Sequence, residues 1–110
     1  MPEIEVYLDR KGSNPFGRWF DGLSAPAAAK VTSALVRLEL GNFSSVKGVG
    51  SGVFECRIDF GPGYRVYLGK DGDALVILLG GGSKQRQSRD IEAAKERWRD
   101  YKVRKEQEGK

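Results

Sequence analysis

The chain has 110 residues, a formal net charge of +4 and 39% hydrophobic residues, a composition typical of one folded domain. It has no histidine and one cysteine, which excludes an intramolecular disulfide, a zinc site of the Cys/His kind and catalysis by a Ser-His-Asp or Cys-His arrangement. No apolar run reaches the roughly 20 residues of a membrane span and no signal-peptide pattern is present, so we expect a soluble, cytoplasmic protein with no membrane partner.

The positive charge is concentrated in the last quarter of the chain. Residues 1–83 contain 9 basic and 9 acidic side chains, whereas residues 84–110 contain 10 basic and 6 acidic ones. A polyanionic partner would meet that end first. A basic helix face that only keeps the protein soluble explains the same excess.

Residues 3–8 alternate between polar and apolar side chains, which predicts a half-buried strand with Ile4, Val6 and Leu8 on the buried face. Two helices follow. The first is predicted to begin at Pro15, after an N-cap at Ser13 or Asn14, and to present an aromatic face to the core.

The second helix is predicted to begin after an N-cap at Ser24 and to stop at Gly41. Residues 42–52 contain three glycines and show no periodicity, so we expect a loop there. Lys47 is its only charged residue.

Residues 53–60 and 64–68 alternate as two strands of a hairpin, with their apolar sets on one face. A three-residue loop would place Asp59 opposite Arg65 and Arg57 opposite Tyr67. A register shift of two residues would instead place Arg57 opposite Arg65. In both registers these charged side chains lie close together on the polar face.

Residues 74–79 are continuously apolar, which predicts a strand in the middle of the sheet, and Gly80, Gly81 and Gly82 are expected to let the chain leave it. A last helix is expected after an N-cap at Ser88 and to fray after Lys102, so that residues 103–110 form a loose tail. The prediction is a single α+β domain over residues 1–110, with the order β-α-α-β-β-β-α and a mostly antiparallel sheet.

Two groups of side chains suggest chemistry. Arg57, Arg65 and Tyr67 can hold a phosphodiester, stack on a base and stabilise added negative charge, although cross-strand pairing with Glu55 and Asp59 accounts for the arginines as well. The second group surrounds the start of the last helix and contains Lys84, Arg86 and Arg89. A bound phosphate would compensate their unfavourable position at a helix N-terminus, and so would a pair between Arg86 and Asp90.

Residues 52–101 resemble the phage-derived addiction-module killer proteins of the RelE/HigB toxin superfamily. The resemblance rests on the hairpin FGPGYRVY, on the glycine-rich exit followed by Lys84 and Gln87, and on the helix pattern DI..A...W..Y. It implies a RelE-like fold and a metal-independent endoribonuclease that cuts messenger RNA, often on the ribosome, through attack of the 2′-hydroxyl on the adjacent phosphate. It also implies a cognate antitoxin partner, often a helix-turn-helix protein, and no cofactor.

By this resemblance Arg65 holds the scissile phosphate and Arg57 is a second phosphate ligand. Lys84 and Arg86 contact phosphate or the leaving oxygen, and Lys47 is a candidate for proton transfer. Tyr67 stacks on a base or orients the 2′-hydroxyl. Ser83 replaces an aspartate of many relatives, and the histidines that some relatives use for proton transfer are absent.

Two other functions fit the same scaffold. One is a ParE-like toxin that binds gyrase without enzymatic activity, because a basic C-terminal helix suits a protein or DNA surface equally well. The other is an inactive prophage-derived copy that retains nucleic-acid or antitoxin binding.

Overall fold

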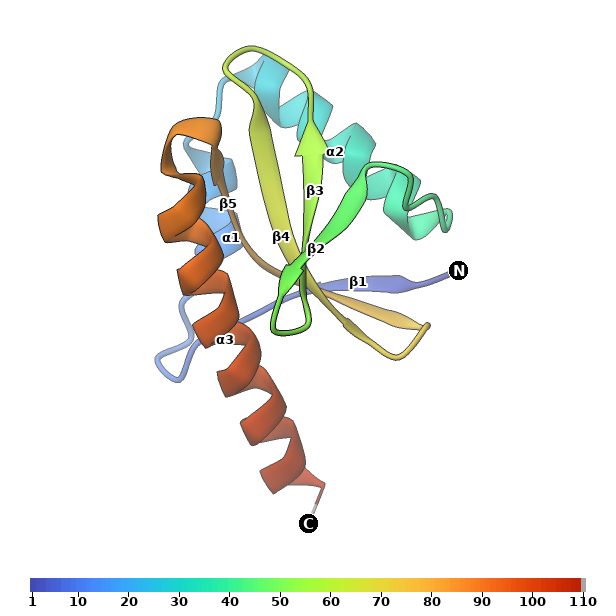
Figure 1. The fold of residues 1–110 in the computed structure, drawn as a ribbon, viewed down its shortest axis with the longest axis vertical. Helices are drawn as coiled ribbons and strands as arrows, with labels where there is room; N and C mark the ends of the chain where they lie inside the picture. The colour runs from blue at the N-terminus through green and yellow to red at the C-terminus, as the bar shows by residue number, and fades with distance from the viewer. Residues whose placement is uncertain (110) are drawn as a thin grey trace.

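The described residues, 1–109 of a computed structural model, form one five-stranded sheet with helices on both faces (Figure 1). The strands are β1 (Glu3–Val6), β2 (Val46–Gly50), β3 (Val53–Ile58), β4 (Tyr64–Asp71) and β5 (Leu75–Ser83). Their order in the sheet is β1-β5-β4-β3-β2, and only the pair β1 and β5 is parallel. The predicted α+β class is confirmed, and β5 is an interior strand as expected, although β4 and not β5 is the middle strand.

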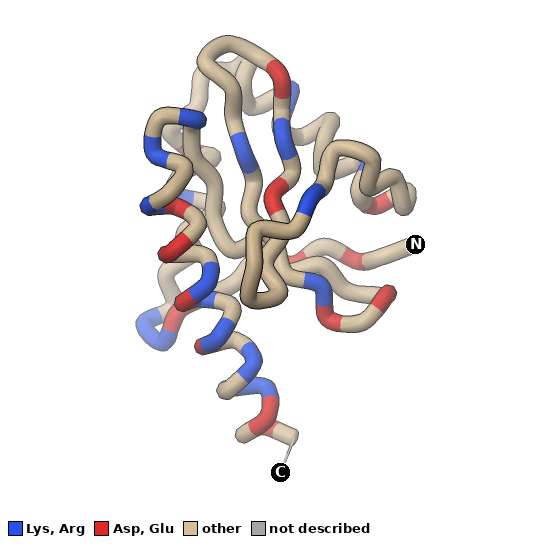
Figure 2. Tube along the Cα trace, in the orientation of Figure 1, with Lys and Arg blue, Asp and Glu red and all other residues tan. Residues whose placement is uncertain are grey.

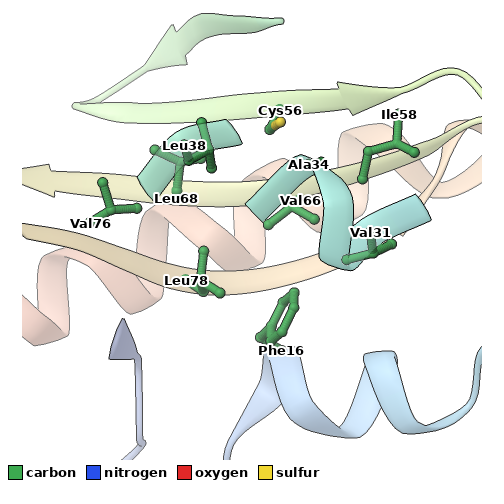
Figure 3. Close-up of a cluster of buried hydrophobic side chains, with 10 residues drawn as sticks. All are labelled: Phe16, Val31, Ala34, Leu38, Cys56, Ile58, Val66, Leu68, Val76 and Leu78. Atoms are coloured by element: carbon green, nitrogen blue, oxygen red, sulfur yellow. The ribbon is translucent and has the colours of Figure 1, made fainter. Parts of the chain in front are cut away.

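One face of the sheet is covered by α1 (Pro15–Asp21) and α2 (Ala25–Glu39). Both begin as predicted: the Asn14 side chain accepts the Gly17 N–H at 2.9 Å, and the Ser24 hydroxyl accepts the Ala27 N–H at 3.3 Å. Figure 3 shows the core under these helices. Its buried members are Phe16, Val31, Ala34, Leu38, Cys56, Ile58, Val66, Leu68, Val76 and Leu78.

The opposite face carries α3 (Gln87–Glu108), which follows the short 3-10 turn η1 (Lys84–Arg86). The core beneath it consists of Tyr7, Val53, Tyr67, Ile77, Leu79, Ala94 and Trp98. In Figure 1 α3 crosses this face, and its C-terminal half runs beyond the sheet. None of the helices within residues 1–109 is both long and apolar enough to span a membrane.

The loop predicted over residues 42–52 is wrong, because β2 lies within it and pairs with β3. Its glycines obscured the alternation, and a bulge between Gly48 and Gly50 shifts its register. The sheet therefore has five strands instead of the four predicted.

The glycines at positions 80–82 do not end β5, which pairs with β4 up to Ser83. A Cβ at Gly81 would overlap the Trp19 ring, and one at Gly82 would overlap the Asp90 carboxyl group. The glycine run therefore lets side chains from α1 and α3 pack directly on the strand.

Three expectations for the chain ends are also corrected. β1 ends at Val6, and Tyr7 is buried whereas Val6 and Leu8 are exposed, because Tyr7 turns under α3 and donates its hydroxyl to Asp100 at 2.6 Å. Ser88 does not cap the last helix, which begins at Gln87 and continues through residues 103–108. The predicted loose tail is thus helical up to Glu108, and Lys110 lies outside the described residues.

Candidate functional site

A cleft of about 530 Å³ opens where β2, β3 and β4 leave the α3 side of the sheet uncovered. Its basic lining comes from four elements: Lys47 on β2, Arg57 on β3, Arg65 on β4 and Lys84 at the start of η1. Figure 2 shows these strands side by side with charged positions at the same level. All four residues predicted to be catalytic therefore surround one cavity.

The register of the hairpin determines how the arginines meet. Arg57 lies directly opposite Arg65, and Glu55 lies opposite Tyr67, so the shifted register is the one adopted. Asp59 lies in the connection and does not oppose Arg65. Two like charges that face each other across strands repel, so this pair favours a bound anion between or above them.

Arg65 is held by a buried carboxylate. Glu55 is 0% exposed and Arg65 is 6% exposed, and Arg65 Nε lies 3.2 Å from Glu55 Oε2. The Nε edge is not aligned for a hydrogen bond with this oxygen, so the contact is mainly one of opposite charges. Because Glu55 engages the Nε edge, the terminal nitrogens are the part of the guanidinium that can reach a ligand in the cleft.

Glu55 also contacts two other elements. Lys47 Nζ on β2 lies 3.7 Å from Glu55 Oε1, and the Gln87 side-chain amide on α3 donates to Glu55 Oε2 at 3.1 Å. This single carboxylate therefore connects β2 and β4, which border the cleft, with the start of α3. The expected pairing of Arg65 with an acidic residue is present, and within residues 1–109 its partner is Glu55, which lies buried behind the arginine that lines the cleft.

Lys84 reaches the cleft because η1 is tied to the hairpin connection. The Lys84 backbone N–H donates to the Gly63 carbonyl at 3.1 Å. Gly63 has φ +84°, a conformation that glycine adopts without strain. The bond places a lysine ammonium on the side of the cleft opposite Lys47.

Tyr67 does not have the predicted position. It is 0% exposed beneath α3, so a base cannot stack on its ring or contact its hydroxyl. Burial raises the pKa of Tyr67 to about 12, and nearby Glu55 and Asp90 act in the same direction. The phenol therefore stays neutral, and the base-stacking role is withdrawn.

Arg86 and Arg89 lie away from the cleft. Arg86 borders a separate cavity next to Asp90, and Arg89 lies on the outer side of α3 beside Ser51 and Glu92. The turn η1 directs Lys84 and Arg86 to different sides, which their spacing in the sequence did not reveal. Only Lys84 of the three cations predicted at this turn contributes to the cleft.

Sequence reasoning missed the central role of Glu55 and gave Gln87 no function. An acidic residue on the polar face of a strand is usually solvated, so nothing in the pattern distinguished Glu55 from Asp59. Within residues 1–109 no group of three or more Cys, Asp or Glu side chains is placed to hold a metal ion. The cleft presents four basic side chains, which can attract and polarise a phosphodiester.

No protein-family model matches the chain. A comparison with curated proteins finds an uncharacterized protein from Haemophilus influenzae that is 48% identical over 81 residues. The match covers 73% of this chain and 82% of the Haemophilus protein.

Proposed function

The chain belongs to the same family as the Haemophilus influenzae protein, and we propose that it is a metal-independent messenger-RNA endoribonuclease of the RelE/HigB superfamily, the toxin of a type II toxin-antitoxin system. The observation that carries the proposal is the cleft in which Arg57 and Arg65 face each other between Lys47 and Lys84. The mixed five-stranded sheet, with α3 on the face that carries the cleft, is compatible with a RelE-like fold.

In the proposed reaction a 2′-hydroxyl oxygen attacks the adjacent phosphorus. The P–O2′ bond forms while the P–O5′ bond breaks, the 2′-hydroxyl loses a proton, and the leaving 5′ oxygen gains one. The products are a 2′,3′-cyclic phosphate and a 5′-hydroxyl end. Negative charge increases on the phosphoryl oxygens in the transition state, where fixed cations stabilise it more strongly than they stabilise the substrate.

The positions of the cations suggest separate roles. Arg65 is buried and fixed by Glu55, so it is the pre-positioned donor for the phosphoryl oxygens. Arg57 is exposed and acts as the second phosphate ligand. Lys84 is suited to the leaving oxygen, and proton transfer by Lys47 stays a prediction.

The proposal is tested by incubating purified protein with free single-stranded RNA in EDTA and, separately, with messenger on ribosomes in a magnesium buffer, and mapping the ends. We expect 5′-hydroxyl and 2′,3′-cyclic phosphate ends. Arg65→Ala should lower the cleavage rate by roughly 10² to 10³, equivalent to about 2.7–4 kcal/mol of barrier. Arg37→Ala, which removes an exposed arginine from the α2 side, should cleave at the normal rate.

A wild-type protein that leaves RNA intact in both conditions would refute the nuclease. DNA damage with intact messenger after induction would favour the gyrase-binding alternative. A folded Arg65→Ala protein with full activity would refute the assignment of Arg65. Circular dichroism of each variant establishes that the fold is retained.

A cognate antitoxin is part of the proposal. The excess of basic residues after position 84 supports an acidic partner segment. Expression of the chain alone should arrest growth, and co-expression of the neighbouring reading frame should restore it. Growth that does not depend on that frame would argue against this partner.

A further inference from the structure

A second cavity of about 420 Å³ lies on the other side of η1, between α1, the end of β5 and the first turns of α3. Three arginines border it: Arg18 from α1, Arg86 from η1 and Arg97 from α3. None of these arginines forms a salt bridge within residues 1–109. Three guanidinium groups from three elements therefore converge without a paired carboxylate.

Two carboxyl groups also border this cavity and interact with the arginines through their charge, Asp9 with Arg18 and Asp90 with Arg86 and Arg97, but three arginines still outnumber two carboxyl groups. Asp9 Oδ1 accepts the backbone N–H groups of Lys11 and Ser13, both at 2.9 Å. Asp90 packs against Gly82, and burial raises the pKa of its carboxyl group although the neighbouring arginines act in the opposite direction. The cavity thus retains a net attraction for an anion.

An aromatic ring completes the cavity. Trp19 lies flat against Gly81, where a Cβ would overlap the ring. Its centroid is 6.2 Å from that of Tyr64, in an edge contact, and Tyr64 borders the first cleft. Trp19 is partly exposed and lies beside guanidinium groups. Proteins use this combination to bind single-stranded nucleic acids, because bases stack on the ring and phosphates pair with the cations.

The two cavities lie on either side of η1. Lys84 borders the cleft and Arg86 borders the second cavity, and two residues span at most about 7 Å along the chain. A strand whose phosphate is held beside Lys84 can therefore reach Arg86 with a neighbouring nucleotide. An acidic peptide would satisfy the arginines, but it would make no use of Trp19 or of the short distance along the chain between Lys84 and Arg86.

We propose that this cavity is a second subsite for the same RNA strand, which holds a nucleotide flanking the cleavage site with its phosphate on Arg18 and Arg86 and its base on Trp19. The inference rests on the proposed nuclease function. Arg97 Nη1 donates to the Leu79 carbonyl at 3.0 Å, so this guanidinium is fixed on β5 at the border of the cavity and is not assigned a phosphate.

The test compares two oligonucleotides with 2′-O-methyl sugars, which bind but cannot attack the phosphate. One has two nucleotides and the other has six. The longer one should bind more tightly and quench tryptophan fluorescence, and the signal reports on Trp19 because Trp98 is only 5% exposed. Arg18→Gln should weaken the longer oligonucleotide by about tenfold, the equivalent of ~1.4 kcal/mol, and leave the dinucleotide unaffected.

Arg37→Gln is the matched control, because it removes an exposed arginine from the face covered by α2. An equal loss of affinity for the six-nucleotide strand in both variants, or no loss in Arg18→Gln, would overturn the subsite. So would quenching by a hexaglutamate peptide in place of RNA, which would indicate a protein partner. Arg18-dependent binding without cleavage of unmodified RNA would refute the nuclease and leave the subsite standing.

Discussion

The side of the sheet that faces α3 is divided into two halves built from the same strands. In one half Val53, Ile77 and Leu79 lie under Ala94 and Trp98 of the helix. In the other half β3 and β4 carry Glu55, Arg57 and Arg65, and the face opens into the cleft. Helix α3 packs on the first half through Ala94, Trp98 and Tyr101, and it leaves the charged half open at Arg57.

The covered half depends on space as much as on apolar surface. A Cβ at Gly69 would overlap the Trp98 ring, and one at Gly52 would lie 2.9 Å from the indole nitrogen. The Trp98 ring also stacks on Tyr101 with centroids 5.1 Å apart. The two glycines thus form a slot that fixes α3, whereas the charged half has no such slot and stays available to a ligand.

The largest effect on stability is expected from Trp98→Ala. Removing a buried tryptophan leaves a cavity that the glycine slot cannot close, so the free energy of unfolding should fall by about 3–5 kcal/mol. Urea denaturation followed by circular dichroism measures this loss. The matched variant in the open half, Arg57→Ala, should change stability by less than about 0.5 kcal/mol because its side chain is exposed.

A loss of similar size in both variants would show that the two halves do not differ as the structure indicates. A loss below about 1 kcal/mol for Trp98→Ala would show that α3 is held mainly by its polar contacts. The Trp98→Phe variant distinguishes these outcomes, since it retains the aromatic ring but fills less of the slot.

An intermediate effect is expected at Glu55, where the open half meets the core. Glu55→Ala leaves the buried Arg65 without its counterion, which should lower stability by about 1–3 kcal/mol. Glu55→Gln keeps the size and the acceptor oxygen for Gln87, so we expect a smaller loss of stability. Because it frees Arg65 from its fixed position, it should still slow RNA cleavage.

The measurement at Glu55 is therefore a pair: thermal unfolding and the cleavage rate under saturating RNA. A slower rate in a variant with nearly normal stability supports positioning of Arg65. Equal rates in wild type and Glu55→Gln would mean that the ion pair has only a structural role. A weaker affinity for RNA with an unchanged maximal rate would mean that the ion pair supports RNA binding and not stabilisation of the transition state.

Local patterns in the sequence predicted the elements that have strong local signals. The N-caps at Asn14 and Ser24 and the buried strand at residues 75–79 were found because capping and apolar runs are local properties. Strand β2 escaped prediction because glycines pair through their backbone and leave no side-chain pattern. The continuation of β5 through Gly80 to Gly82 depends on side chains from α1 and α3, which no local window contains.

For the candidate site too, local patterns were predictable from the sequence and long-range packing was not. The sequence placed Arg57 and Arg65 on one face, because alternation fixes which side chains share a face. It did not reveal that Tyr67, two residues beyond Arg65, lies under α3, since the helix covers the face only from that point. Alternation gives the face of a residue, and only the path of a distant helix decides whether that face is open.

The smallest effect is expected where the covered half ends, at Asp71 on the last position of β4. Its carboxylate accepts the Tyr101 hydroxyl at 2.8 Å and a hydrogen bond from Lys105, and these two bonds hold its pKa below the usual range. The ionised form therefore stabilises the folded protein above the unfolded pKa of about 3.9, and this contribution is lost as the pH falls through the folded pKa.

Asp71→Asn should lower stability at pH 7 by no more than about 1 kcal/mol, since the Lys105 partner is exposed to solvent. The difference from wild type should shrink as the pH is lowered below 4, which thermal unfolding across that range measures. Asp73→Asn on the same turn is the control, because Asp73 is exposed and belongs to no salt bridge within residues 1–109. A difference at Asp71 that stays constant with pH would mean that packing of Tyr101, and not the charge, anchors this end of α3 to the sheet.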